Sequence, residues 1–117
     1  MADLLTRFLS ADVLTPAEYA PGSIGSSYAV DFASDRQVQV LDAVTSTLEI
    51  TKGSGWPATG RYAAVKLKLV VVGTPTITWT VADIWTTDIP TGAAGTWYVN
   101  LEFIDGDIVA SAGLKQV

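Results

Sequence analysis

The chain has 117 residues, of which 49% are hydrophobic and 16% are charged, and its net charge is −5 at pH 7. This length predicts one domain with a single core, and the scattered basic side chains form no stripe of the kind that binds nucleic acid. The sequence contains no cysteine and no histidine. Disulfides, thiolate metal sites and the usual catalytic triads are therefore excluded.

The first 27 residues predict an arm and a linker. At residues 3–10, Leu4 can meet Phe8 and Leu5 can meet Leu9 at the i,i+4 spacing of a short helix. Such a helix is marginal alone, so we expect the arm to fold against the body, a neighbouring copy or another protein. Residues 15–27 combine prolines, glycines and serines without periodicity, which indicates an extended linker. We expect neither an export signal nor membrane insertion, because no apolar run is long enough.

A β domain is predicted for residues 28–117. Alternating apolar positions indicate seven short strands, at residues 28–33, 37–41, 46–51, 61–72, 76–81, 96–104 and 107–111. Seven short strands separated by turn signals favour an all-β fold, an antiparallel β-sandwich of jelly-roll type. Residues 73–75, with a glycine and a proline, predict a hairpin between the strands at 61–72 and 76–81. Asp105 and Gly106 predict a type I′ turn that closes the last hairpin.

Several side chains have a predicted place in these strands. Trp79 and Trp97 are in register with aliphatic neighbours, so we expect them in the core. Lys66 and Lys68 share one strand face, where lysine commonly discourages pairing at a sheet edge. In the loop at residues 52–60, three glycines are expected to let Trp56 and the following proline project outward.

The order of these parts resembles a small β-module that recurs in phage tail fibres and other virion surface proteins. The matching elements are an apolar strand at 65–72, the T-I-T-W run at 76–79, Trp85, a threonine- and glycine-containing loop at 86–95, Trp97-Tyr98 and Asp105-Gly106. The resemblance covers about residues 28–111. Where the family is usually rich in proline and glycine after its tryptophan, this chain has D-I-W-T-T-D-I at 83–89.

The resemblance implies a bacteriophage virion structural protein, made in the host cytoplasm and located in the virion. We expect a homo-oligomeric accessory module on the particle surface, a homotrimer that contacts major capsid or tail proteins through its N-terminal arm. A capsid decoration or cement protein is favoured, with a short head- or tail-fibre component close behind. No cofactor and no enzymatic activity are expected.

Two alternatives stay open. A receptor- or glycan-binding tip module of a tail fibre would bind a host surface glycan and predicts that Trp56 or Trp85 is exposed. A carboxylate-dependent enzyme would need paired acids, and Asp105 and Asp107 are more typical of a turn. The candidate interface or ligand contacts are Trp56, Trp85, Tyr98, Leu4, Leu5, Phe8 and Leu9, and Tyr98 lies opposite Trp97 on its strand, facing solvent or a trimer axis.

Overall fold

The computed structural model describes residues 18–22 and 24–115, in which every regular element is a β-strand. The all-β fold is thereby confirmed for this part of the chain. No helix long and apolar enough to cross a membrane occurs among these residues. The predicted arm, including Leu4, Leu5, Phe8 and Leu9, lies outside the described residues.

Nine strands make up the fold. They are β1 (Glu18–Tyr19), β2 (Ser27–Val30), β3 (Val38–Val44), β4 (Leu48–Lys52), β5 (Ala63–Val71), β6 (Ile77–Trp79), β7 (Ile84–Trp85), β8 (Gly95–Ile104) and β9 (Asp107–Lys115). All seven predicted strands are present, with ends shifted by a few residues. The two-residue strands β1 and β7 were not predicted, because so short a segment carries no periodicity. Because β1 lies within the predicted linker and pairs with β3, the β domain begins before residue 28.

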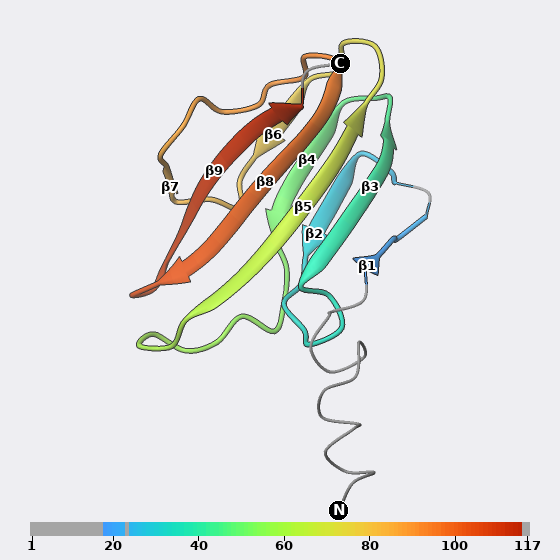
Figure 1. Cartoon of the computed structure of the whole chain (residues 1–117). Helices are drawn as coiled ribbons and strands as arrows, with labels where there is room; N and C mark the ends of the chain where they lie inside the picture. Colours follow the sequence, from blue (N-terminus) through green and yellow to red (C-terminus); the bar gives the residue numbers. More distant parts are fainter. Residues whose placement is uncertain (1–17, 23, 116–117) are drawn as a thin grey trace, which may run out of the picture.

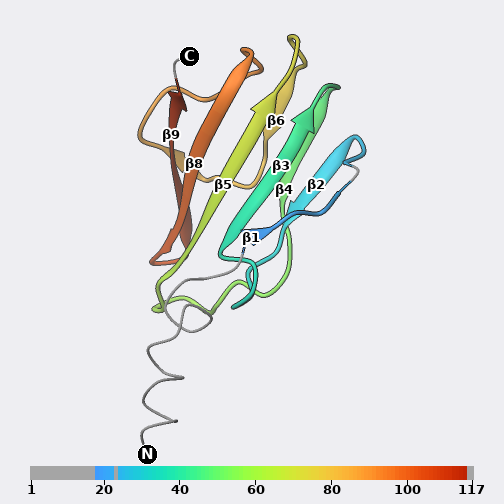
Figure 2. The ribbon, with the colours of Figure 1, turned by 45° about the vertical axis from the view of Figure 1, so that its right-hand side comes forward.

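The strands form two sheets that face each other. The larger sheet has the order β1-β3-β5-β8-β9-β7, and the smaller sheet has the order β2-β4-β6 and lies behind it (Figures 1 and 2). From β1 to β6 the chain alternates between the sheets. Each of the four strands from β3 to β6 pairs in parallel with the strand two places earlier in the chain. The first six strands therefore form a flattened coil of three turns, which the β8–β9 hairpin extends.

The predicted antiparallel arrangement is wrong for most of this fold. Among the described strand pairs, only β5–β8 and β8–β9 are antiparallel. The predicted hairpin at residues 73–75 is also wrong, because β6 pairs with β4 in the other sheet. A turn with glycine and proline reverses the chain in either case, and periodicity does not say in which sheet the next strand pairs.

The last hairpin is confirmed. Ile104 pairs with Asp107, and the two residues between them have positive φ, 50° at Asp105 and 87° at Gly106. Positive φ at both central residues defines the type I′ turn, whose twist matches that of the flanking strands. This turn fixes the register of β8 against β9.

The core lies between the sheets. Alternation along β5 buries Val65, Leu67, Leu69 and Val71 and leaves Lys66 exposed. The other buried apolar side chains are Val30, Leu41, Val44, Leu48, Ile50, Ala63, Ile77, Trp79, Val81, Val99, Leu101, Phe103, Ile108 and Ala110. Each large aliphatic side chain buried in this way contributes about 1.5–3 kcal/mol. Trp79 is in the core as predicted. Trp97, which was also predicted to lie in the core, is half-buried and packs against the core cluster.

Candidate functional site

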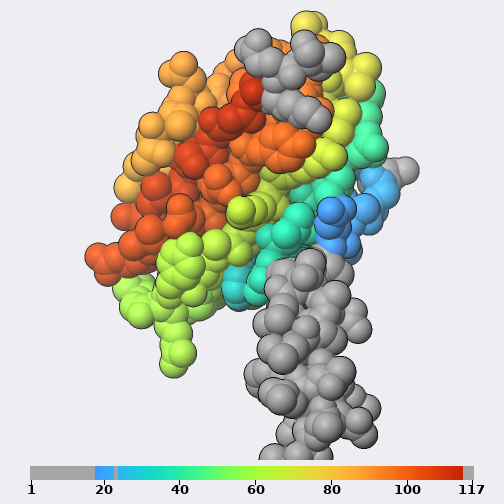
Figure 3. Space-filling view, in the orientation of Figure 1, coloured from blue at the N-terminus to red at the C-terminus, as the bar shows by residue number. Residues whose placement is uncertain are grey.

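The outer face of the six-stranded sheet has no other described element packed over it, and it is the face turned toward the viewer in Figure 3. Two large apolar side chains of β8 and the residue before β5 are exposed here: Tyr98 at 44%, Ile104 at 47% and Tyr62 at 66%. Tyr98 lies opposite the half-buried Trp97, as predicted. Exposed apolar side chains gathered on one face are typical of interaction surfaces.

Part of this face forms an open groove, which we call the lysine groove. Its volume is about 470 Å³, and its outward-facing lining side chains are Glu18, Val38, Val40, Lys66, Lys68, Tyr98 and Asn100. The register places Lys66 between Val38 and Asn100, and Lys68 between Val40 and Tyr98. Four strands that lie far apart in the sequence therefore supply one continuous surface.

The two lysines of the groove do not sit at a sheet edge. They lie on β5, which has β3 on one side and β8 on the other, so the predicted role against edge pairing is wrong. Within residues 18–22 and 24–115 the one ion pair joins Arg36 Nη1 to Asp31 Oδ2 at 3.3 Å. Lys66 and Lys68 therefore have no carboxylate within ion-pair distance in that part of the chain. The groove therefore carries two lysines and one carboxylate, Glu18, on a protein whose net charge is −5.

A second feature of the outer face lies where β8 ends and β5 begins. Arg61, Tyr62, Ile104 and Asp105, together with Gly60, surround a shallow hollow of about 280 Å³, and we call these residues the Tyr62 rim. The Tyr62 hydroxyl donates a hydrogen bond to Glu102 Oε2 at 3.0 Å. This bond favours the protonated phenol and raises the pKa of Tyr62. The rim therefore combines two exposed large side chains, Tyr62 and Ile104, with the charged Arg61 and Asp105.

Trp56 packs inward, so the expectation that it projects outward is wrong. Its Nε1 donates a hydrogen bond to the carbonyl oxygen of Val30 at 2.9 Å. Its ring is half-buried between Phe32 and Phe103, with centroid distances of 5.6 Å and 6.2 Å. Gly55 explains the direction of the loop, because a Cβ at this position would lie 2.1 Å from the Phe32 carbonyl oxygen. The glycines let the loop approach the body closely instead of leaving it.

The other tryptophans hold the connection between β6 and β8. Trp85, in β7, is half-buried and meets Trp79 edge to face with a centroid distance of 5.3 Å. Trp79 Nε1 donates to the carbonyl oxygen of Pro90 at 2.6 Å, and Trp97 Nε1 donates to that of Ala93 at 2.8 Å. Trp79 and Trp85 therefore pack against each other, and Trp79 and Trp97 each bond to the backbone between β6 and β8.

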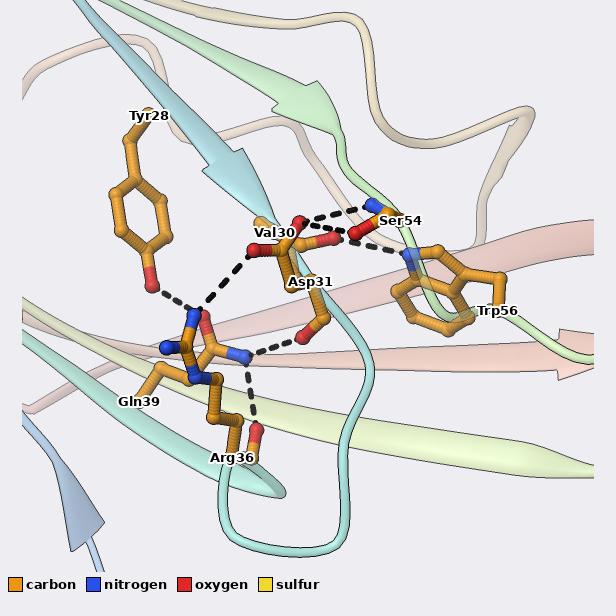
Figure 4. Close-up of polar contacts among 7 residues, drawn as sticks. All are labelled: Tyr28, Val30, Asp31, Arg36, Gln39, Ser54 and Trp56. Atoms are coloured by element: carbon orange, nitrogen blue, oxygen red, sulfur yellow. Dashed lines mark hydrogen bonds and ion pairs between the residues drawn. The ribbon is translucent and has the colours of Figure 1, made fainter.

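A polar network surrounds the buried side chain of Gln39 and reaches the partly exposed Asp31 and Arg36 (Figure 4). Gln39 is 0% exposed and is the one buried polar residue of the described chain. Its Oε1 accepts a hydrogen bond from the Tyr28 hydroxyl, and its Nε2 donates to the carbonyl oxygens of Asp31 at 2.9 Å and Arg36 at 2.8 Å. Sequence reasoning missed this residue, because glutamine in a short strand is usually solvated.

Charged groups extend the network outward. Asp31 Oδ1 accepts a hydrogen bond from the Ser54 amide at 2.8 Å, and the Arg36 guanidinium lies 4.1 Å from the ring centre of Tyr19. Burial, followed by the nearby Tyr19, raises the pKa of Tyr28 to about 12. The network joins β1, β2, β3 and the loop after β4, and every buried side-chain polar atom in the described residues has a partner. These contacts hold the four segments together, so the role of the network is structural.

The chain matches no family model, no curated protein and no solved structure. No group of three or more acidic side chains that could hold a metal ion occurs among residues 18–22 and 24–115. Asp105 and Asp107 both lie exposed at the β8–β9 turn. The outer sheet face and the tryptophans are the features of the described residues that bear on function.

Proposed function

We propose that this protein is a structural component of a bacteriophage virion, a homo-oligomeric accessory module on the particle surface. Within that class it acts as a capsid decoration or cement protein, or as a short head- or tail-fibre component. The observation that supports this proposal most is the use of Trp79, Trp85 and Trp97 to build the fold. Side chains committed to packing and to backbone hydrogen bonds serve architecture, and the resemblance is to architectural modules.

The same observation weighs against a tip module that binds through tryptophan. Trp56 and Trp85 were the exposed platforms that such a module requires, and both are half-buried in aromatic contacts. An enzyme is not proposed. The two facing sheets suit a stiff spacer, and we class the fold as a sandwich variant in which the chain winds between the layers.

The Tyr62 rim is the surface through which copies contact each other in this proposal. Tyr62 and Ile104 are about half or more exposed and adjoin each other, and tyrosine is enriched at protein interfaces. Arg61 and Asp105 on the same rim provide opposite charges that can pair between copies. The part of the predicted N-terminal arm that precedes β1, residues 1–17, docks the oligomer on other virion proteins.

The self-association is tested on the full chain by light scattering coupled to size exclusion. The wild type should form a trimer at micromolar concentration, and I104E should shift it to monomer, because a charge on the rim opposes burial. The matched control is T78E, which adds the same charge at an exposed position of β6 in the smaller sheet. A monomeric wild type, or equal effects of both variants, would contradict the proposed contact.

The location is tested by immunogold labelling of intact phage particles with an antibody to this chain. Label spread over the capsid faces supports decoration, and label at vertices or at the tail supports a fibre component. Intact particles without label, in a preparation whose disrupted particles do not contain the chain, would overturn the virion assignment.

A further inference from the structure

We propose that the lysine groove binds an acidic saccharide, a short chain of pyranose units that carry carboxylate groups. This inference goes beyond the proposed assembly role and uses different residues of the outer face. It depends on the shape of the groove, on its charge and on the mixture of apolar and polar groups that line it.

The groove is preorganised. Its lining comes from β1, β3, β5 and β8, neighbouring strands whose backbones are held by sheet hydrogen bonds. A volume of about 470 Å³ lies within the range of about 300–1,000 Å³ that small-molecule sites occupy. Side chains on the interior strands of a sheet keep their relative positions, so a ligand would not have to order a loop on binding.

The charge of the groove favours a carboxylate ligand. Lys66 and Lys68 are two residues apart on the same face of β5, so their Cα atoms lie about 7 Å from each other. Lys66 is exposed and Lys68 is half-buried, and neither forms an ion pair within the described residues. Hydrogen bonds from ammonium groups to a carboxylate are about twice as strong as neutral ones.

The remaining lining suits the two kinds of surface that a sugar ring presents. Tyr98, beside Lys68, offers an exposed aromatic ring to the apolar C–H face of a pyranose. Asn100 can donate and accept hydrogen bonds with ring hydroxyls, and Glu18 can accept them. Val38 and Val40 form an apolar floor between Glu18 and the lysines.

Other occupants fit this lining less well. A nucleic acid needs several cations along its backbone, and the groove has two lysines with a carboxylate at its far side. A second copy that covered the groove would remove both ammonium groups from water, which is costly unless carboxylates of that copy meet them in good geometry. An acidic sugar chain supplies carboxylates that can pair with the two lysines, and it leaves the rest of the groove hydrated.

The test is isothermal titration of the full chain with a tetramer of galacturonic acid, compared with the neutral sugar maltotetraose. We expect binding of the acidic probe only, weakened by added salt. The K66Q/K68Q double variant and Y98A should each weaken binding by about tenfold or more. The matched control K52Q removes a lysine from β4 in the other sheet and should leave the titration unchanged.

Each alternative outcome is informative. Equal binding of both sugars, or unchanged binding by K66Q/K68Q, would overturn the proposal, as would absence of binding at millimolar probe. Loss of self-association in K66Q/K68Q without sugar binding would assign the groove to the contact between copies. The I104E variant should bind the acidic probe normally, so failure of the assembly proposal and failure of the saccharide proposal give different results.

Discussion

Replacing Gln39 by methionine tests whether the buried network stabilises the coil. Gln39 is fully buried, and its side chain takes part in three hydrogen bonds. Methionine has a similar length and is apolar, so the substitution removes these bonds and leaves little empty space. The Tyr28 hydroxyl and the carbonyl oxygens of Asp31 and Arg36 would then lack their partner.

The expected loss follows from those three orphaned groups. Each costs about 1 kcal/mol, since the network is only partly buried and water can reach some of its members, so Q39M should lose about 3 kcal/mol. That is a large share of the roughly 5–15 kcal/mol by which domains are stable. The assay is urea unfolding followed by tryptophan fluorescence, with the slope expected to stay unchanged.

A control variant and a double-mutant cycle test whether the loss of stability comes from the hydrogen bonds of Gln39. Q37M changes a half-buried neighbour whose side chain forms no hydrogen bond in the described structure, so it should change the free energy of unfolding by less than about 0.5 kcal/mol. A double-mutant cycle of Q39M with Y28F should give a coupling of about 1 kcal/mol. A Q39M protein within about 0.5 kcal/mol of the wild type would refute the reasoning.

Three further predictions concern single contacts. G92A should destabilise by about 3 kcal/mol in urea unfolding, because a Cβ would lie 1.7 Å from the Pro75 carbonyl oxygen at a φ of +131°. W79F keeps a ring in the core and leaves the buried Pro90 carbonyl without its donor, so it should lose about 1–2 kcal/mol in thermal unfolding. The pKa of Tyr28, raised from 10.0 to about 12, means that the folded state holds this proton more tightly. The contribution of this proton to the free energy of unfolding is fully present below pH 10 and is lost as the pH rises to 12. After allowance for solvent screening it is about 1 kcal/mol. The Y28F variant should therefore lose less stability than the wild type between pH 10 and pH 12.

Local structure was the predictable part of this fold. In β5 apolar residues occupy every second position and Lys66 and Lys68 lie between them, so the sequence predicts the strand and also which side chains are buried. The Asp105-Gly106 turn was predictable for a similar reason, since its conformation depends on two adjacent residues. Both signals are carried by neighbours in the chain.

The pairing of strands was not predictable in the same way. β6 pairs with β4, which comes before β5 in the sequence. Both β4 and β6 belong to the smaller sheet, which does not contain β5. Choosing between a hairpin and a crossing between layers depends on the summed packing of both sheets. Residues 73–75 permit either, so a prediction from turn residues alone favoured the commoner antiparallel solution.

In the candidate site, the sequence predicted the outward direction of Tyr98 and the shared face of Lys66 and Lys68, but not the groove that they line. In the segment around β3, Val38 and Val40 face the outer groove, and Gln39 points into the protein, the reverse of what polarity alone suggests. The outcome follows from the register of β3 against β5, which places Gln39 beside the buried Leu67. A glutamine fits there because Tyr28 and two carbonyl groups satisfy its amide.

The two features of the outer face constrain each other through the cost of desolvation. If another copy covered the whole face, Lys66 and Lys68 would be buried without an assigned carboxylate, at a cost of several kcal/mol per ion. Burying Tyr62 and Ile104 is instead favourable in free energy, because each removes apolar surface from water. An oligomer that gains from the Tyr62 rim and avoids the cost of the lysines must therefore end its contact before Lys66. In such an oligomer the lysine groove would stay open to solvent, so the proposed acidic saccharide could reach it.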